Sequence, residues 1–535
     1  MSTGLETTFR VLAATETDAV SRLLIEGLDS PHAAIRRMAL ETILARRNLV
    51  GHREIVSRLH RFDASWQAIV RENRDRMTPA LREALVGDDR QAWSNACTAA
   101  VWFRQYDLIP ALVGALEEPG HPGVELLSRT LLELVGLLGE DLSAPEEPGR
   151  HHAPERVRSH VLGSLELSVG RYAVHRRRAV IETLVDVAPP DAAVLREILA
   201  NPYHPVFLVL VDVLSRGARP ASIGLLLGLL EDPRAPSAAL SVIGRRSDAA
   251  FVEALLAKIG RDFSAVAQNL RRIESVTWAS DGAWGLIDRL DEQSQRAAVR
   301  LVMTSNTPRD HAYALVERLL DRGKPGGRQA AAEALDEFYG SAANARALHA
   351  LEDADPGVRA AVIPHIRRRG IPGALARLID MLDDPHPAVC SAARESLGEF
   401  SFQNFLIMFQ TLDEERRRST GELVKRVDPQ VASQLAAEME SQVRRRRLRA
   451  LAIAQLLDLS RQVEASLLGL LHDEDHVVRA EAAACLGQCR SPESRDALLA
   501  ALDDRSLTVR EAAQRSLDQR GEPAAGPVAG RSGEG

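Results

Sequence analysis

The sequence predicts an all-α protein, an α-solenoid in which stacked antiparallel helical hairpins form a superhelix. An arginine, replaced once by Cys390, recurs at intervals of 26 to 33 residues between residues 359 and 510, each time with an apolar residue seven positions later. A period near 30 residues that persists over several steps is typical of stacked helical repeats. Aromatic residues make up only 4% of the 535-residue chain. Strand-type alternation is scarce, which favours helices packed through small side chains.

The clearest repeat runs from His472 to Gly487, with the sequence HDEDHVVRAEAAACLG. The acidic run 473–475 stands where a helix N-terminus has unpaired N–H groups and a partial positive charge. Gly487 is placed to end the helix in the left-handed conformation. Segment 465–471 is expected to fold back as the first helix of a hairpin. Four small or apolar residues fall on one helix face, namely Val478, Ala482, Cys485 and Leu486.

Alignment on Arg479 gives an expected register for the C-terminal repeats. The aligned pairs are Arg359 with Ile366, Cys390 with Leu397, Arg416 with Leu423, Arg449 with Leu456, Arg479 with Leu486, and Arg510 with Leu517. We expect Arg479 to be a repeated framework position that pairs with a carboxylate of a turn.

An acidic turn, a Val-Arg pair and an Ala-rich helix ending in Leu-Gly make the chain resemble the HEAT-like repeat family. The Val-Arg pairs at 358–359, 478–479 and 509–510 carry this resemblance. The match is to the short variety, with repeats of about 30 residues, that is found in bilin lyases and many bacterial repeat proteins. The resemblance implies an α-solenoid and says almost nothing about activity.

The repeat pattern and its interruptions predict four regions. We expect HEAT-like helical repeats at 1–138, an exposed Pro/Gly-rich loop at 139–155, the main HEAT-like array at 156–520 and a disordered tail at 521–535. The loop holds three prolines and two glycines among polar residues, a composition that disfavours helix. The tail has no apolar face. The loop is either a domain boundary or a long insertion between helices.

The charge and hydropathy of the chain limit its partners and location. The formal net charge is −7 and the sequence pI is about 6.1, so no global attraction to nucleic acid or anionic membranes is expected. No 18-residue apolar span occurs, and the N-terminus has no basic region leading into an apolar run. We therefore expect a cytoplasmic protein without membrane insertion. The oligomeric state is left open.

No motif in the chain demands a catalytic group, a metal or a cofactor, and none of these is predicted. The chain has no His-Glu dipeptide of the kind that deoxyhypusine hydroxylases use to hold iron, and no Walker, nucleophile-elbow or Rossmann pattern. His472 and His476 lie in a turn, where four-residue spacing does not place them on one face. The adjacent histidines at 151–152 are expected to be solvated. The four cysteines are too few and too scattered for a disulfide framework, and Cys485 and Cys489 are expected to be buried small residues.

Two groups of aromatic residues interrupt the repeat pattern. The first, Trp66, Trp93, Trp102, Phe103 and Tyr106, is expected to pack within irregular repeats, with an exposed apolar patch as the alternative. The second, Trp278 and Trp284 around Asp281, resembles in residue types the site of HEAT-like alkylpurine DNA glycosylases. Such an enzyme needs a strongly basic concave surface, and a net charge of −7 argues against it.

The candidate binding residues are arginines in excess of the repeat pattern. They are proposed to bind an anionic partner, and comprise Arg416, Arg417, Arg418, Arg444, Arg445, Arg446 and Arg447. Equivalent positions in successive repeats stack side by side, so these side chains are expected to form a ridge. The alternative is that they pair with acidic turns such as 413–415.

The function favoured by these observations is a non-enzymatic scaffold or adaptor that binds a protein or peptide, acidic segments included, on the concave face of the solenoid. The alternative is a bilin-lyase-like chaperone or lyase, or a HEAT-like enzyme acting on nucleic acid. The sequence does not decide whether the chain has enzymatic activity, and does not identify the partner.

Overall fold

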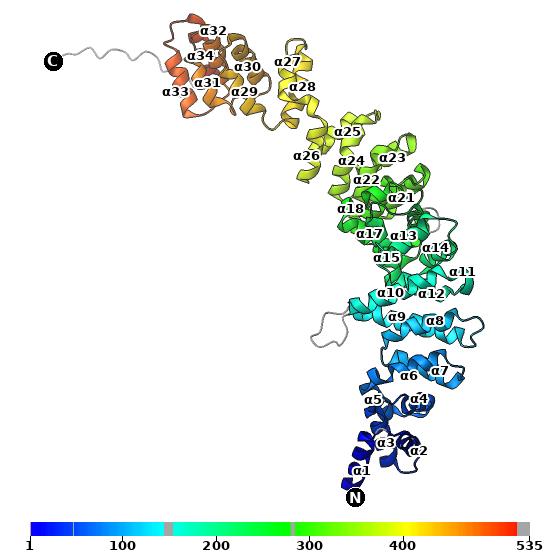
Figure 1. Cartoon of the computed structure of the whole chain (residues 1–535). Helices are drawn as coiled ribbons and strands as arrows, with labels where there is room; N and C mark the ends of the chain where they lie inside the picture. The colour runs from blue at the N-terminus through cyan, green and yellow to red at the C-terminus, as the bar shows by residue number, and fades with distance from the viewer. Residues whose placement is uncertain (1, 16, 47, 144–153, 280–283, 522–535) are drawn as a thin grey trace, which may run out of the picture. The chain divides into compact units, whose positions relative to one another are not determined.

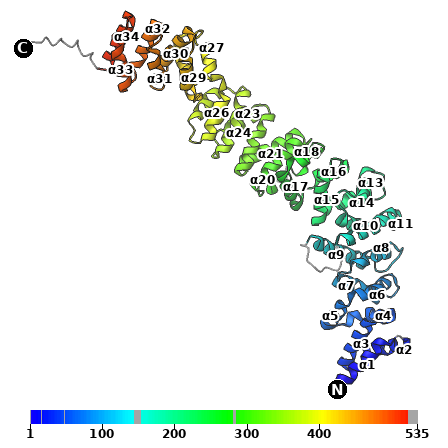
Figure 2. The ribbon, with the colours of Figure 1, turned by 60° about the vertical axis from the view of Figure 1, so that its left-hand side comes forward.

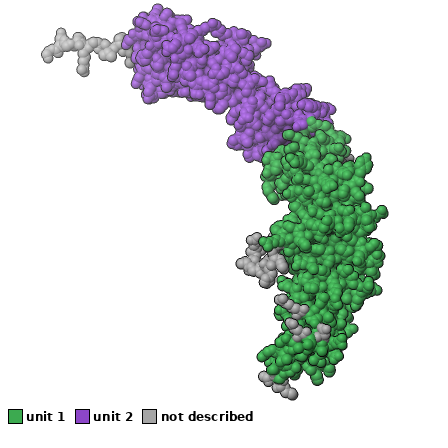
Figure 3. All heavy atoms as spheres, viewed as in Figure 1, with its two compact units in different colours: residues 1–327 green, residues 328–535 purple. Residues whose placement is uncertain are grey.

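The protein is described by a computed structural model covering residues 2–15, 17–46, 48–143, 154–279 and 284–521. It divides into two compact units, residues 1–327 and 328–535 (Figure 3). The described residues form α-helices and short 3₁₀ helices and no strand. The prediction of an all-α fold is therefore confirmed.

Unit 1 is a series of helices that follow one another along the chain (Figure 1). Its α-helices are α1 (Ser2–Ala14), α2 (Asp18–Leu28), α3 (Ala33–Ala45), α4 (Leu49–Arg58), α5 (Ala64–Glu72), α6 (Arg74–Val86), α7 (Arg90–Trp102), α8 (Ile109–Glu117), α9 (Val124–Ser143), α10 (Pro154–Gly170), α11 (Tyr172–His175), α12 (Arg178–Val187), α13 (Ala193–Ala200), α14 (Phe207–Arg216), α15 (Pro220–Glu231), α16 (Ser237–Arg245), α17 (Ala249–Arg261), α18 (Phe263–Leu270), α19 (Trp284–Ile287), α20 (Glu292–Thr304) and α21 (Arg309–Arg322). The 3₁₀ helices are η1 (Leu59–Arg61), η2 (Tyr106–Leu108) and η3 (Thr277–Ala279).

Unit 2 continues the same pattern, and α22 (Pro325–Ala334) begins in the last residues of unit 1. Its further α-helices are α23 (Ser341–Ala350), α24 (Pro356–Arg368), α25 (Ala374–Asp380), α26 (Pro387–Ser396), α27 (Phe402–Met408), α28 (Glu414–Val427), α29 (Val431–Met439), α30 (Arg444–Leu456), α31 (Glu464–Leu470), α32 (His476–Leu486), α33 (Pro492–Ala501) and α34 (Leu507–Gln519). The 3₁₀ helices are η4 (Leu335–Glu337), η5 (Met381–Asp383) and η6 (Gly398–Phe400).

Within each unit the helices pack as hairpins that stack on one another. In unit 1, α8 packs on α9, and α7 and α12 pack on α9 from neighbouring hairpins. In unit 2, α31 packs on α32, α33 packs on α34, and α30, α32 and α34 are successive neighbours; Figures 1 and 2 both show these hairpins side by side. Buried side chains from α27 to α34 form one continuous core. Each unit is therefore an α-solenoid, in which repeats contact their neighbours.

The repeat at 472–487 folds as its residues predict. The Asp475 carboxylate accepts hydrogen bonds from the N–H groups of Val477 and Val478, at 2.8 and 3.3 Å, and so caps α32. The four residues of its predicted apolar face are all fully buried. The preceding helix, α31, packs against α32, which confirms the predicted hairpin.

The prediction that Gly487 adopts the left-handed conformation is wrong. Its φ is −55°, so it stays in the right-handed helical region rather than the left-handed one. A Cβ at this position would lie 2.9 Å from the Ser516 Oγ of α34. The glycine is therefore required by close packing between successive helices rather than by the geometry of a turn.

The helix boundaries narrow the predicted loop at 139–155. Helix α9 extends to Ser143, and α10 begins at Pro154, so both ends of this range are helical. Proline is tolerated in the first turn of a helix, and Leu138, itself a residue of α9, is buried. Residues 144–153, including the histidines at 151–152, lie outside the described residues, as do 522–535 of the predicted tail. The predicted arrays at 1–138 and 156–520 differ from the two compact units.

Among the described helices, none alone is long and apolar enough to cross a bilayer. One pair, α14 and α15, reaches the required length and composition only when taken together, with a bend of 109° between its members.

Candidate functional site

A repeated arginine links successive turns of unit 2 and defines which arginines belong to the framework. Arg359 donates to Asp384, and Arg479 to Asp504, each through two hydrogen bonds of 2.9 to 3.0 Å. Each also donates from Nη1 to a carbonyl of its own turn at 2.7 Å. The prediction that Arg479 pairs with a turn carboxylate is confirmed.

Arg447 occupies this framework position in the repeat before Arg479. Its side chain and that of Asp473 are only 9% and 7% exposed, and the Nε to Oδ2 distance is 2.8 Å. Arg447 Nη1 donates to Ser441 O at 2.9 Å. Because this guanidinium is buried and paired, it does not belong to an exposed anion-binding ridge, which corrects the assignment made from the sequence.

The aligned register also shifts in two repeats. Arg417, not Arg416, donates to a turn carbonyl, with Nε 2.6 Å from Phe409 O, and its guanidinium lies 4.7 Å from the centre of the Phe409 ring. Arg447, not Arg449, is the framework residue of the next repeat. The positions seven residues after Arg417 and Arg447 are fully buried, Val424 and Ala454. A run of arginines fits two or three registers equally well, and burial decides between them.

Three of the remaining predicted arginines form exposed ion pairs. Arg416 lies 3.4 Å from Asp413, and Arg418 lies 4.0 Å from Glu414, with all four side chains at least 60% exposed. Arg444 Nε lies 2.6 Å from Asp475 Oδ2. This hydrogen bond, with the two backbone N–H bonds of the helix cap, lowers the pKa of Asp475 to about 2.

Arg445 and Arg446 share a surface pocket of about 470 Å³, which we call the α27–α30 pocket. Arg445 donates to the side-chain oxygen of Gln410. Arg446 is exposed and has no ion-pair partner in the described part of the chain. The complete lining comprises Gln403, Leu406, Ile407, Gln410, Glu438, Val443, Arg445, Arg446 and Arg449.

The charge of the α27–α30 pocket is not balanced by its own acidic residue. Glu438 is engaged by Arg449, with Nη2 3.0 Å from the carboxylate, and Arg449 also donates to Leu406 O at 3.1 Å. Arg445 and Arg446 therefore have no carboxylate partner among the described residues. Both stand in the first turn of α30, whose N-cap residue Val443 makes no side-chain cap, so the positive end of the helix dipole adds to their charge.

Exposed apolar side chains border these arginines. Ile407 is 77% exposed, Val443 is 53% exposed, and Met408, next to Ile407, is 42% exposed. These exposed apolar side chains were not predicted from the sequence. The run FLIMF at 405–409 indicates them, because five consecutive apolar residues are more than one helix face can bury.

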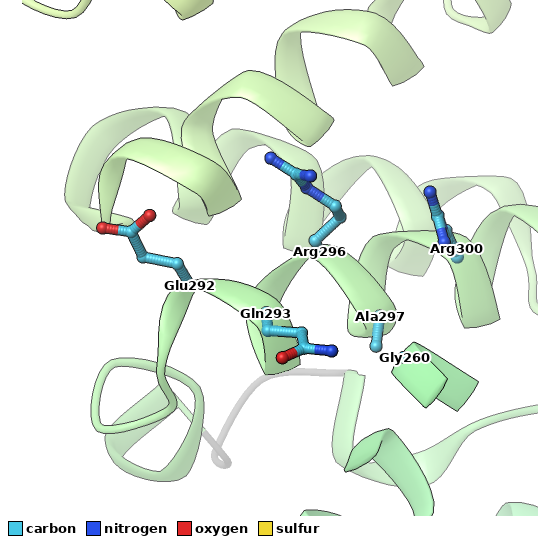
Figure 4. Close-up of a pocket in the computed structure, with 6 residues that line it drawn as sticks. All are labelled: Gly260, Glu292, Gln293, Arg296, Ala297 and Arg300. Carbon is cyan, nitrogen blue, oxygen red and sulfur yellow. The ribbon is translucent and has the colours of Figure 1, made fainter. Parts of the chain in front are cut away.

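A second pocket, of about 360 Å³, lies in unit 1 between α17 and α20 (Figure 4). Glu292, Arg296 and Arg300 follow one another along α20, and Figure 4 shows the Glu292 carboxylate and the Arg300 guanidinium at opposite ends of the set. Its lining is completed by Gly260, Gln293 and Ala297. Its lining contains charged side chains but no large apolar side chain that could contact a hydrophobic group of a ligand.

The cysteines and the potential metal-ligating residues show no sign of a reactive or metal-binding site in the described part of the chain. All four cysteines are free and buried, which confirms the burial predicted for Cys485 and Cys489. Burial raises the pKa of Cys485 to about 12 and that of Cys489 to about 11, which disfavours the reactive thiolate. The described residues contain no group of three or more His, Cys, Asp and Glu side chains that could hold a metal ion.

The two aromatic groups lie partly in the core and partly at the surface. In the first, Trp93 and Phe103 are buried, which fits packing, whereas Trp102 is 38% exposed. In the second, Trp278 is 1% exposed, so its ring is not available to stack against a base. Trp284 is half-buried, and the Arg318 guanidinium lies 6.0 Å from its ring centre. Asp281 lies outside the described residues.

The chain was compared with known families, sequences and structures. A HEAT repeat model matches residues 312–398 and 429–527. No curated protein matches the sequence. A structure from a study of the interaction between cadherin and beta-catenin has 13% identity and a TM-score of 0.36, with 93% of this chain and 98% of that chain covered.

Two structures of Kap121p are more distant. Kap121p bound to Pho4p has 13% identity and a TM-score of 0.23, with 97% of this chain and 54% of that chain covered. Kap121p alone has 12% identity and a TM-score of 0.23, with 96% and 63% covered. The chain thus spans less than two thirds of the protein chain in either of these two structures. These low scores carry no argument about function. The chain therefore contains HEAT repeats, in the matching segments 312–398 and 429–527, within a fold of stacked helical hairpins.

Proposed function

We propose that this protein is a non-enzymatic scaffold whose α27–α30 pocket binds an acidic segment of a partner protein. The observation that carries the proposal is the combination, in one pocket, of two exposed apolar side chains and two guanidiniums that have no carboxylate partner among the described residues. The guanidiniums are those of Arg445 and Arg446, and the apolar side chains are Ile407 and Val443. A cytoplasmic location remains part of this proposal.

The apolar part of the pocket supplies the driving force for association. Full burial of a side chain such as isoleucine contributes about 1.5–3 kcal/mol, and Ile407 is 77% exposed in the unbound protein. An exposed patch bordered by polar residues is typical of protein-binding sites. A partner segment that inserts an apolar side chain between Ile407 and Val443 therefore stabilises the complex.

The arginines select the charge of the partner. A guanidinium binds a carboxylate through two parallel hydrogen bonds, so it discriminates by geometry as well as by charge. The Arg446 guanidinium has no partner among the described residues. Arg445 would give up a hydrogen bond to the neutral side-chain amide of Gln410 on binding a carboxylate. Binding an acidic segment leaves the framework pair of Arg447 and Asp473 intact.

The test is a charge reversal limited to the pocket. The variant R445E/R446E and a control, R394E/R490E, carry the same change in net charge, and both control residues are exposed positions of unit 2. Wild type and both variants are used to capture proteins from an extract of the source cell, and bound segments are mapped by cross-linking.

We expect the pocket variant to lose proteins that the control retains, and the cross-linked segments to be acidic. Circular dichroism must show equal helicity in all three proteins. If the pocket variant and the control capture the same proteins, or if the cross-linked segments are not acidic, the proposal is wrong. An additional variant, Ile407→Ser, tests the apolar contribution while leaving both arginines in place.

A further inference from the structure

A further surface pocket of about 330 Å³ lies in unit 1, between the start of α14 and one face of α16, and we call it the α14–α16 groove. Pro202 and Phe207 line one side of it. Their chain neighbours Tyr203 and Leu208 are 94% and 76% exposed. Tyrosine is among the residues that contribute most to binding at protein interfaces. This side of the groove is therefore apolar and open to a partner.

The opposite side is a polar stripe along α16. Ser237, Ser241 and Arg245 all line the groove, and their spacing of four residues places them on one helix face. None of the three side chains has a hydrogen bond or ion pair in the part of the chain that the structure describes. The stripe thus offers two hydroxyls and one guanidinium to a ligand.

The charge of the groove is positive. Arg272, which also lines it, donates to two neutral acceptors, Asn269 Oδ1 and Ala235 O, each at 2.8 Å, and forms no ion pair among the described residues. Glu274 lines the groove as well and is exposed without an ion pair among the described residues. Two guanidiniums thus face one carboxylate, a balance that favours an acidic group on the ligand.

The spacing of the stripe matches an extended peptide. Residues four apart on a helix are separated by about 6 Å along its axis, and alternate residues of an extended chain are about 6.6 Å apart. Ser237 and Ser241 are therefore spaced to bond alternate peptide groups of an extended segment. Arg245 is spaced to meet the next alternate side chain, while the intervening side chains point toward Pro202 and Phe207.

We infer that the α14–α16 groove binds an extended segment of another protein that carries a carboxylate one or two residues from an apolar side chain. This site is independent of the α27–α30 pocket, which lies in the other unit. The two sites together make the chain a scaffold with two separate points of attachment.

The probe is a phage-displayed library of random dodecamer peptides, selected on the full-length protein. Affinities of the selected peptides are then measured for wild type and for two matched variants. The test variant, S237A/S241A/R245E, removes the polar stripe. The control, S247A/R261E, changes an exposed serine and an exposed arginine of the same unit that lie outside the groove.

We expect the selected peptides to share an acidic residue next to, or one residue away from, an apolar residue. Binding should weaken at least tenfold in the test variant and stay within twofold in the control. Bound peptide should slow amide hydrogen exchange at residues 201–208 and 271–275. The R445E/R446E variant should bind these peptides as wild type does, which separates this site from the proposed function.

The inference is overturned by any of three results. The first is that no peptide is enriched, and the second is that the enriched peptides lack acidic residues. The third is that the test variant binds them as tightly as the control. Thermal unfolding of both variants verifies that a loss of binding does not come from unfolding. If it does, the single variant Tyr203→Ser, which changes only an exposed side chain, replaces the test variant.

Discussion

Arg479 donates to both carboxylate oxygens of Asp504, from Nε at 2.9 Å and from Nη2 at 3.0 Å, although 25 residues separate them in the sequence. Arg479 Nη1 also donates to Asp473 O at 2.7 Å. One guanidinium therefore connects the turn before its own helix to the turn of the next repeat. Burial of Arg479, whose side chain is 5% exposed, keeps these bonds away from competing water.

Arg479→Ala is expected to lower the free energy of unfolding by about 2–4 kcal/mol, because it leaves buried acceptors without a donor. Arg479→Lys should lose part of this amount, since an ammonium cannot reproduce the planar fork. Urea denaturation measures both. The control is Arg490→Ala, an exposed arginine without a described partner, with an expected effect below about 0.5 kcal/mol. An equally small effect at Arg479 would mean that the pair contributes no more than a surface ion pair.

Leu486→Ala is expected to destabilise the C-terminal repeats by about 2–5 kcal/mol, because it leaves a cavity in the core. Leu486 is fully buried, in the cluster that extends from α27 to α34. Hydrogen exchange should accelerate first in α31 to α34. Leu507→Ala is the matched control, since Leu507 is 60% exposed, and it should leave exchange unchanged. Uniform acceleration along the whole chain would contradict the nearest-neighbour behaviour expected of stacked repeats.

Much of the fold follows from local sequence patterns. The position of Asp475 before an apolar helix face is sufficient to predict a helix cap, and the structure has that cap. The recurrence, about every 30 residues, of an arginine with an apolar residue seven positions later is sufficient to predict stacked hairpins. Both patterns depend on residues close together in the chain, which is why they can be recognised without the structure.

The candidate site could be predicted only in part, because its composition depends on distant residues. Arg447 is buried and pairs with the carboxylate of Asp473, 26 residues later in the sequence, whereas its neighbours Arg445 and Arg446 are exposed to solvent. The sequence does not distinguish these three arginines. The exposure of Ile407 likewise depends on which face of α27 packs against the neighbouring helices. Local periodicity predicts a helix in such a segment but not the element that covers it.

Arg444→Gln is expected to raise the pKa of Asp475, because the hydrogen bond from Arg444 is the main cause of its low value of about 2. The folded-state pKa lies below the ordinary value of 3.8. The stabilisation by the charged cap is therefore present above that value and is lost as the pH falls toward 2. A titration of carbon-13-labelled aspartate carboxyl groups measures the shift. Arg490→Gln should leave it unchanged. An unchanged pKa in Arg444→Gln would mean that the backbone N–H groups alone hold the carboxylate.

His52 makes unit 1 sensitive to mild acid. It is 3% exposed in α4, with Nε2 3.2 Å from Ile43 O, and burial lowers its pKa below the ordinary value of 6.5. The unfolded chain therefore binds a proton at His52 more readily than the folded chain does. The stability contributed by neutral His52 is present above about pH 6.5 and is lost as the pH falls below it.

Hydrogen exchange in α3 and α4 should accelerate between about pH 7.5 and pH 5.5, after correction for the intrinsic exchange rate. His52→Gln, which cannot titrate but keeps a donor for Ile43 O, should remove this dependence. Persistence of the same acceleration in His52→Gln would assign the acid sensitivity to another group.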